Sequence, residues 1–353
     1  MHGQSQPWKF ILFGDTIKTS GSPPINTNIL SELANAISNV KPAFVLFMGD
    51  CAMAGSVKNY QIWTNLMFPV YRAGIGVYPT IGNHDSSDIA GFTNVFGPSL
   101  PDNGPEGEYD TTYALTYENA LILVLNEATP ARDYLVNQAW VNAVLATNTR
   151  PHVFAMGHYP AFKIYQTSYL GNYPTNRNNF WHSLSNAHGR IYFCSHDHFY
   201  DHSRLDDGDG NPGNDLHQFI VGTGGAPLYA DGVYDGTNAL WTPKRIFHEK
   251  EYGYVLVEVD GNTVRTTWCH RTNPGTYVPT DEVFSYSVAS PPAPVLQASY
   301  SDGRLVLTWP GSFYSLQATP EVTNIFTNLA GATSPYTLTN LDSPSLFFRL
   351  VWP

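Results

Sequence analysis

Short apolar runs alternate with amphipathic segments through the first half of the chain. The spacing of the apolar positions predicts helices over about 27–38, 57–72 and 132–145. In the last of these helices the positions expected to be buried are Leu135, Trp140, Val141 and Val144. The apolar runs expected to form buried strands are Phe10–Phe13, Ala43–Met48, Val77–Ile81, Val153–Met156 and Arg190–Cys194. Strands that alternate with helices in this way predict a layered α/β domain.

Antiparallel strand pairs are expected beside and after these elements. Thr112–Tyr117 and Ala120–Asn126 are separated by a two-residue turn and predict a hairpin. After residue 198 the pattern turns to β, and the expected strands are Leu216–Gly222, Tyr252–Val259 and Thr263–Cys269. The last two are predicted to pair across the turn at 260–262.

A proline-rich stretch, Ser290-Pro291-Pro292-Ala293-Pro294, divides the chain. Because such a run fits neither a helix nor the interior of a sheet, we interpret 289–295 as a stiff linker. It separates a domain at 1–288 from a module at 296–353. Short alternating strands are expected in that module at Arg304–Trp309, Phe313–Ala318 and Leu346–Trp352. Their size and spacing predict a small β-sandwich of the immunoglobulin or fibronectin III kind.

The C-terminal module resembles modules appended to secreted bacterial hydrolases. It contains no cluster of histidine, cysteine or paired carboxylates. We expect its aromatic residues Trp309, Phe313 and Tyr314 to form its core and not a carbohydrate platform. The module is therefore assigned a structural role, or a role in attachment to a surface or glycan.

Polar residues follow five of the predicted strands. Asp15 and Asp50 each end a Gly-Asp dipeptide, and Gly82-Asn83-His84-Asp85 follows the next strand. His158 follows the fourth strand, and His196-Asp197-His198 follows the fifth. In layered α/β sheets, ligands collect at the carboxyl ends of the strands. Since carboxylate, amide oxygen and imidazole together bind divalent metals, the sequence predicts a metal site there.

These motifs resemble the calcineurin-like metallophosphoesterase family, which includes purple acid phosphatases and many phosphodiesterases. All five blocks occur in the order typical of that family, over about residues 8–285. The resemblance implies a four-layer fold, a β-sandwich flanked by helices. It also implies two divalent or trivalent metal ions, most often Fe, Zn or Mn. The implied ligands are Asp15, Asp50 and His198 for the first ion, and Asp50, Asn83, His158 and His196 for the second.

The chain departs from the family pattern at the first metal. Ile17 stands where the family has a histidine ligand, and Met53 stands where purple acid phosphatases supply a tyrosine. Since neither side chain is a good ligand for hard metals, we expect the first ion to be held weakly. If another residue completes that site, the first candidates are His202 and the loop Asp206–Asp209.

The resemblance implies hydrolysis of a small phosphate ester by a metal-activated water. His84 matches the family histidine that contacts the phosphate and protonates the leaving group. We expect Asp85 to orient the other nitrogen of that ring. Phosphomonoester and phosphodiester both stay open as substrates. The alternative function is a binding protein on the same scaffold, with decayed metal chemistry, that recognises its ligand through aromatic loops and the C-terminal module.

Two loops near the strand ends, at about 86–112 and 159–180, are expected to set specificity. The second is rich in Tyr and Asn, which suits a sugar or nucleoside and equally suits a self-packed loop. Its one arginine, Arg177, is a candidate contact for a second phosphate group. A separate acidic stretch is predicted to be a solvated turn, with calcium as the less favoured interpretation. Its candidate ligands are Asp207, Asp209 and Asn211.

Composition narrows the functional class. The formal net charge of −11 argues against a duplex nucleic-acid binder, whose affinity rests on Lys and Arg. No apolar run is long enough to predict a membrane span. The three cysteines follow no spacing motif and are expected to be buried core residues. The start of the sequence, 1–7, is interpreted as what remains after removal of an export signal, which predicts a secreted or periplasmic protein.

Overall fold

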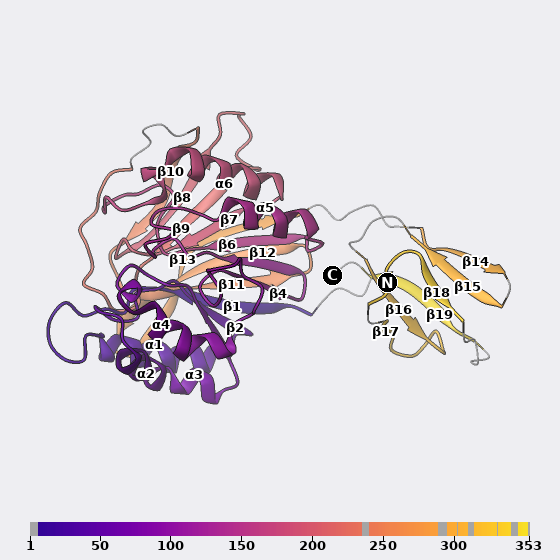
Figure 1. Cartoon of the computed structure of the whole chain (residues 1–353), viewed down its shortest axis with the longest axis horizontal. Helices are drawn as coiled ribbons and strands as arrows, with labels where there is room; N and C mark the ends of the chain where they lie inside the picture. The colour runs from indigo at the N-terminus through magenta and orange to yellow at the C-terminus, as the bar shows by residue number, and fades with distance from the viewer. Residues whose placement is uncertain are drawn as a thin grey trace.

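Two β-sheets pack face to face in the N-terminal part of the chain, and helices lie over both outer faces (Figure 1). The computed structural model describes residues 6–234, 240–288, 295–301, 303–309, 314–329, 331–339 and 345–351. One sheet is covered by α1 (Thr27–Val40), α2 (Val57–Leu66), α3 (Phe68–Arg72) and α4 (Ile89–Phe96), and the other by α5 (Gln138–Thr147) and α6 (Pro174–Asn186). The four-layer fold expected from the sequence is confirmed.

Both sheets contain a block of parallel strands. The first sheet has the order β13 (Thr276–Ser287), β12 (Thr263–Asn273), β11 (Gly253–Asp260), β1 (Trp8–Phe13), β2 (Phe44–Phe47), β3 (Gly76–Pro79). The second has the order β10 (Thr242–Glu249), β8 (Tyr200–Asp206), β9 (Leu216–Val221), β7 (Ile191–Cys194), β6 (His152–Met156), β5 (Ala120–Val124), β4 (Tyr113–Tyr117). Strands β1–β3 are parallel, as are β5, β6, β7 and β9. The predicted antiparallel pairs β4–β5 and β11–β12 are confirmed.

Strand β1 shows why these runs are apolar at every position. Phe10 and Leu12 pack into the core between the two sheets, whereas Ile11 and Phe13 pack against the helices on the outer face. All four side chains are fully buried. A strand buried on both faces has no polar side to show, so its sequence is continuously hydrophobic.

Two predicted helices have different boundaries from those expected. The helix predicted over 57–72 is two helices, α2 and α3, which meet at Met67. Pro69 is accommodated in the first turn of α3, where a missing backbone N–H costs no hydrogen bond. The helix predicted from Arg132 begins instead at Gln138, because Asn137 caps it by accepting a hydrogen bond from the N–H of Trp140. Of its four expected core positions, Val141 is fully buried and the other three are half-buried.

Several elements were not predicted from the sequence. Helix α4 lies within the first expected specificity loop, and α6 occupies part of the second. The sequence of α6 is rich in Asn and starts with Pro174, so its helical period is hard to recognise. Its apolar residues Phe180, Trp181 and Leu184 nonetheless pack into the core beneath the second sheet.

The C-terminal part of the chain forms two small antiparallel sheets. One contains β14 (Gln297–Ser301), β15 (Arg304–Thr308) and β18 (Tyr336–Leu338), and the other β17 (Thr327–Asn328), β16 (Ser315–Thr319) and β19 (Phe347–Val351). Leu307, Trp309 and Leu316 form the core, and Tyr314 packs against them, as expected for these aromatics. An all-β module is thus confirmed. Residues 289–294 of the predicted linker at 289–295 lie outside the described residues, as does Phe313, and the domain boundaries stay a prediction.

Candidate metal centre

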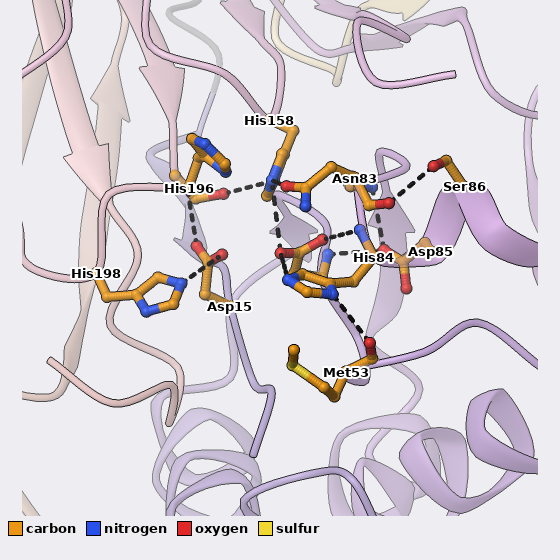
Figure 2. A network of polar contacts seen from close by, with 12 residues as sticks. Asp15, Met53, Asn83, His84, Asp85, Ser86, His158, His196 and His198 are labelled. Carbon is orange, nitrogen blue, oxygen red and sulfur yellow. Dashed lines mark hydrogen bonds and ion pairs between the residues drawn. The ribbon is translucent and has the colours of Figure 1, made fainter. Parts of the chain in front are cut away.

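Tight turns at the strand ends bring the predicted ligands together (Figure 2). Asp15, Asp50 and His196 all adopt left-handed backbone conformations, with φ of 60°, 60° and 69°. Non-glycine residues rarely adopt this conformation, and where they do, it often marks a functional site. Gly82 lets its own turn pack closely against the turn that carries Asp50. A Cβ atom at Gly82 would lie 2.2 Å from Asp50 Oδ1.

Asp15 and His198 form one side of the centre. Asp15 Oδ1 lies 3.5 Å from His198 Nε2, and both side chains are buried. The other oxygen of Asp15 accepts a hydrogen bond from the backbone N–H of His196 at 3.0 Å. His198 Nδ1 lies 3.0 Å from the carbonyl oxygen of Pro227, an acceptor that requires a proton on Nδ1. His198 Nε2 is thereby the nitrogen directed toward Asp15, and in the neutral ring it is the nitrogen that carries the lone pair.

The other predicted ligands form the second side. One ligand atom from each of Asp50, His158 and His196 lies within 4.8 Å of the other two. His158 Nε2 is 3.6 Å from Asp50 Oδ2 and 2.8 Å from Asn83 Oδ1. The ring of His158 is oriented from behind, because its Nδ1 lies 2.8 Å from the carbonyl oxygen of Met48. Such support from a backbone carbonyl is common for metal-binding histidines.

The hydrogen bonds among these side chains leave two of their polar atoms without a partner, which favours bound metal ions. Asp15 Oδ1 and His196 Nε2 are buried without a hydrogen-bond partner, which is costly for a polar atom in a protein interior. Asp15 Oδ1 lies 3.5 Å from His198 Nε2, another predicted ligand atom. Oxygen and imidazole donors of this kind suit Zn, Fe and Mn. A bound cation would satisfy Asp15 Oδ1 and offset the negative charge of the two carboxylates.

Burial also shapes the charges of the centre. Burial raises the pKa of Asp50, and the nearby charge of Asp15 adds to this effect against the opposing influence of His158. For Asp15, burial acts in the same direction, but its interactions with His198 and the other histidines outweigh it and lower the pKa. Burial and the neighbouring His158 lower the pKa of His196 well below its usual value. A neutral His196 is the form that can bind a metal.

His84 stands at the open side of the centre. Its side chain is 26% exposed, and its Nε2 lies 3.9 Å from Asp50 Oδ2. Its other ring nitrogen, Nδ1, lies 2.9 Å from the carbonyl oxygen of Met53. The expectation that Asp85 orients this ring is therefore wrong. The side chain of Met53 was not expected to contribute to the site. Its backbone carbonyl, however, holds the ring of His84 (Figure 2).

Asp85 has a different position, beneath the turn that carries Asp50. Its Oδ2 accepts hydrogen bonds from the backbone N–H groups of Asp50 and Gly82 at 2.7 and 3.0 Å, and its Oδ1 accepts one from Cys51 at 3.1 Å. Burial, together with the charge of Asp50, raises the pKa of Asp85 to about 7. Asp85 is thus a positioning residue behind the centre, not one that faces a substrate.

Two further carboxylates support the centre and were missed in the sequence. Glu127 accepts hydrogen bonds from the N–H of Tyr159 at 3.0 Å and from the hydroxyl of Tyr192 at 2.8 Å, which fixes the turn after His158. Burial raises its pKa to about 8. Asp197 lies between two ligand histidines, a signal the sequence did contain. Its carboxylate accepts three backbone N–H hydrogen bonds, which come from Ile164, Tyr165 and Gln166.

Two other candidates do not join the centre. His202 is buried elsewhere, with Nδ1 2.5 Å from Glu282 and Nε2 2.8 Å from His217, so it does not complete the first metal site. Arg177 is fully buried, bonds to Asn178 and lies over the ring of Phe162. The hypothesis from the sequence that Arg177 contacts a second phosphate group is therefore wrong. Arg177 was expected to be exposed because helix α6 was not recognised in this Tyr- and Asn-rich segment.

The acidic stretch near residue 207 forms turns. Asp207, Asp209 and Asn211 each accept a hydrogen bond from the backbone N–H two residues ahead, at 2.9, 2.6 and 3.1 Å. Such Asx turns use the oxygens that a calcium ion would need. The preferred expectation of a turn is confirmed. The acidic groups that do lie close together are Asp206, Asp207 and Asp215, a different set.

Two expectations from composition can be compared with the described residues. Cys51, Cys194 and Cys269 are free and buried, as expected. Among the described helices, none is long and apolar enough to cross a membrane.

Comparisons with known proteins agree with this geometry. The purple acid phosphatase PPD1 of yellow lupin (Lupinus luteus) seeds aligns over 81% of this chain and 55% of its own, with a TM-score of 0.61 and 17% identity. GAP50, the anchor in the inner membrane complex of Plasmodium, aligns over 80% and 90%, with a TM-score of 0.57 and 14% identity. A dimetal phosphatase from Danio rerio aligns over 80% and 99%, with a TM-score of 0.51 and 11% identity.

These structural likenesses show the shared fold, and the chain spans about half the length of the lupin enzyme. No curated protein matches the sequence. The model of the calcineurin-like phosphoesterase family matches residues 9–200, more than half of the chain and the part that holds every predicted ligand. The chain belongs to the calcineurin-like phosphoesterase family.

Proposed function

We propose that this protein hydrolyses small phosphoric esters at a centre of two metal ions. The observation that carries the proposal is the convergence of Asp50, His158 and His196 within 4.8 Å, beside buried ligand atoms that lack hydrogen-bond partners. Asp15, Asp50 and His198 would hold the first ion, and Asp50, Asn83, His158 and His196 the second. Two bound cations would acidify water and stabilise the charge of a phosphate in its transition state.

His84 supplies the proton in this proposal. The carbonyl of Met53 accepts a hydrogen bond only from a protonated Nδ1, so Nε2 is the nitrogen free to hold and release a second proton. Nε2 faces the centre, 3.9 Å from Asp50 Oδ2, and the partial exposure of the ring lets it meet a substrate. A protonated Nε2 can bind a phosphate oxygen and donate its proton to the leaving alcohol.

A binding protein on the same scaffold is the alternative function. It is favoured by the first site, where Ile17 is buried and pairs with Ile25, and where the suggested replacement His202 bonds instead to Glu282 and His217. The Plasmodium neighbour, described as an anchor, is an example of the fold outside a named enzyme. The placement of His84 supports hydrolysis, because simple binding does not require a proton donor beside the metals.

Metal reconstitution combined with a turnover assay tests the proposal. The full chain is stripped with a chelator and reloaded separately with Mn²⁺, Zn²⁺ or Fe²⁺. Each form is assayed with p-nitrophenyl phosphate and bis-p-nitrophenyl phosphate, and the stripped protein serves as control. We expect turnover of at least one ester that depends on the added metal, and the two esters distinguish monoesterase from diesterase. Tight metal binding with no turnover would support the binding protein.

We propose a secreted or periplasmic location for this enzyme. The proposal is supported by a composition with few charged residues, 13%, and 14% aromatic residues. The all-β C-terminal module is proposed to serve in attachment to a surface or glycan. Fractionation of the natural host by antibody detection tests the location, and an intracellular protein pool would contradict it.

A further inference from the structure

Three aromatic rings form a stacked column that starts at a predicted metal ligand. The ring of Tyr229 lies on the ring of His198, with centroids 4.1 Å apart and planes 17° apart. Tyr165 lies on Tyr229 in turn, at 4.7 Å and 18°. These are offset-stacked distances for aromatic side chains. Because His198 Nε2 faces Asp15, the column stacks on the flat face of the His198 ring and not on the edge that would bind the metal.

Hydrogen bonds hold the ring of Tyr229 and the backbone that carries Tyr165. The backbone N–H of Tyr229 donates to the carbonyl of His198 at 3.0 Å, and its hydroxyl accepts from Gln166 Nε2 at 2.9 Å. Asp197 holds the backbone at Tyr165 through the three N–H groups of 164–166. The two tyrosines therefore lose little conformational freedom when a ligand contacts them. Preorganised aromatic side chains of this kind are efficient contact surfaces.

Support of His198 explains Tyr229 but not Tyr165. One tyrosine already covers the histidine ring, and the second adds nothing to that contact. Tyr165 is 46% exposed although one face of its ring is covered by Tyr229. Among the described residues, Tyr229 is the one aromatic ring that contacts Tyr165. A rigid aromatic ring that stays open to solvent beside a catalytic centre can stack on a planar group of a ligand.

We propose that Tyr165 stacks on the base of a nucleotide, and that nucleoside monophosphates are the substrate class of this centre. Tyr165 lies two ring spacings from His198, so the group stacked on it cannot be joined directly to the phosphate. A ribose supplies the required spacer between phosphate and base, whereas a simple aryl phosphate has none. Since every base has an aromatic face, we expect little discrimination among the four bases. The inference rests on the proposed phosphoesterase function.

The test compares adenosine 5′-monophosphate with ribose 5-phosphate, which share the phosphate and sugar and differ in the base. We expect kcat/KM to favour the nucleotide by about tenfold or more in the unaltered protein. In Tyr165→Ala this ratio should approach one, mostly through KM, and in Tyr165→Phe it should be retained. Tyr300→Ala, at a 66% exposed tyrosine of β14, is the matched control and should keep the ratio. An unchanged ratio in Tyr165→Ala, or a ratio near one in the unaltered protein, would overturn the proposal.

Calorimetric binding separates this inference from the proposed function. The dissociation constants of both compounds are measured with metal-loaded protein, before and after the Tyr165→Ala substitution. Tighter binding of the nucleotide that is lost in Tyr165→Ala, without turnover of either compound, would support the stacking site and contradict the hydrolase. Turnover of both compounds with equal binding would support the hydrolase and contradict the stacking site.

Discussion

The carboxylate of Asp85 accepts a hydrogen bond from the backbone N–H of Asp50, with 2.7 Å between the two atoms. The side chains of His84 and Asp85, neighbours in the Gly-Asn-His-Asp motif, thus contact different parts of the site. His84 faces the open side of the centre, whereas Asp85 turns back and holds the loop that presents the shared carboxylate. This relationship changes what each substitution in the motif is expected to do.

Asp85→Asn should weaken metal binding and turnover together, by about 10–100-fold. The amide would place an N–H₂ group against backbone N–H groups that now donate to a carboxylate, and the turn at Asp50 would shift. Metal content after dialysis and kcat/KM on two esters measure the effect. Asp88→Asn is the matched control, because Asp88 caps α4 and Asn is an equally good cap. A loss confined to esters with poor leaving groups would instead indicate action through His84.

His84→Asn should slow alkyl esters by about 10²–10⁴-fold and nitrophenyl esters far less. A good leaving group needs little protonation, so the proton at Nε2 matters mainly for poor ones. Metal content should stay nearly unchanged. His188→Asn is a suitable control, since His188 is exposed and its φ of 58° is tolerated by Asn. Equal losses on both ester types would show that His84 binds phosphate without transferring a proton.

The first metal should leave before the second. The first ion would be held by Asp15, Asp50 and His198. A fourth ligand is not expected from Ile17, Met53 or His202. Dialysis against a mild chelator should therefore remove one ion per chain first, with activity following that ion. Ile17→His should slow this loss if the ring reaches the centre, and Ile17→Leu controls for the disturbed packing. Two ions that leave at the same rate would contradict the weak first site.

The strand-end motifs that carry the candidate ligands could be located in the sequence, whereas the partners of their supporting carboxylates could not. All six predicted metal ligands lie at strand ends, because each ends a short apolar run that could be located by its own pattern. Glu127 and Asp197 accept hydrogen bonds from backbone N–H groups 32 and 33 residues away, so their partners could not be located from the sequence, although Asp197 itself stands in the His-Asp-His motif. Asp85 was assigned to the wrong partner for the same reason. Besides Gly82, its backbone donors are Asp50 and Cys51, in a turn 35 and 34 residues earlier.

The helices show a similar limit. Strands β1 and β2 were located because full burial leaves a continuous apolar run. Helix α6 was missed because its buried Arg177 and several Asn residues disguise the apolar period, although Phe180 and Trp181 lie in the core. Tertiary packing decided that helix, and packing between distant segments cannot be recognised from a single stretch of sequence.

Stability should fall in acid because of His217. Burial, aided by the charge of His202, lowers the pKa of His217 to about 2, below its ordinary value of 6.5. Between these values the unfolded chain binds a proton that the folded chain does not. The contribution of neutral His217 is thus fully present above about pH 6.5 and is lost as pH falls, by up to about 1.4 kcal/mol per pH unit.

His217→Gln tests this pH dependence. The Gln amide can donate or accept a hydrogen bond at the position of His217 Nδ1, which lies 2.8 Å from His202 Nε2, but it does not titrate. We expect the free energy of unfolding, measured with urea, to fall less steeply in the variant than in the unaltered protein between about pH 6.5 and pH 5. Parallel curves would show that the folded protein binds a proton in this cluster.

In the proposed centre two metal ions share the carboxylate of Asp50, and the Asp50→Asn variant removes that shared anionic ligand. Metal content per chain and kcat/KM on an aryl phosphate are measured on the same preparations of both proteins. We expect about two ions per chain in the unaltered protein. Because the substitution removes the shared anionic ligand, the variant should lose metal from both sites and activity by orders of magnitude. Full metal occupancy with near-normal turnover in Asp50→Asn would contradict the shared-ligand centre.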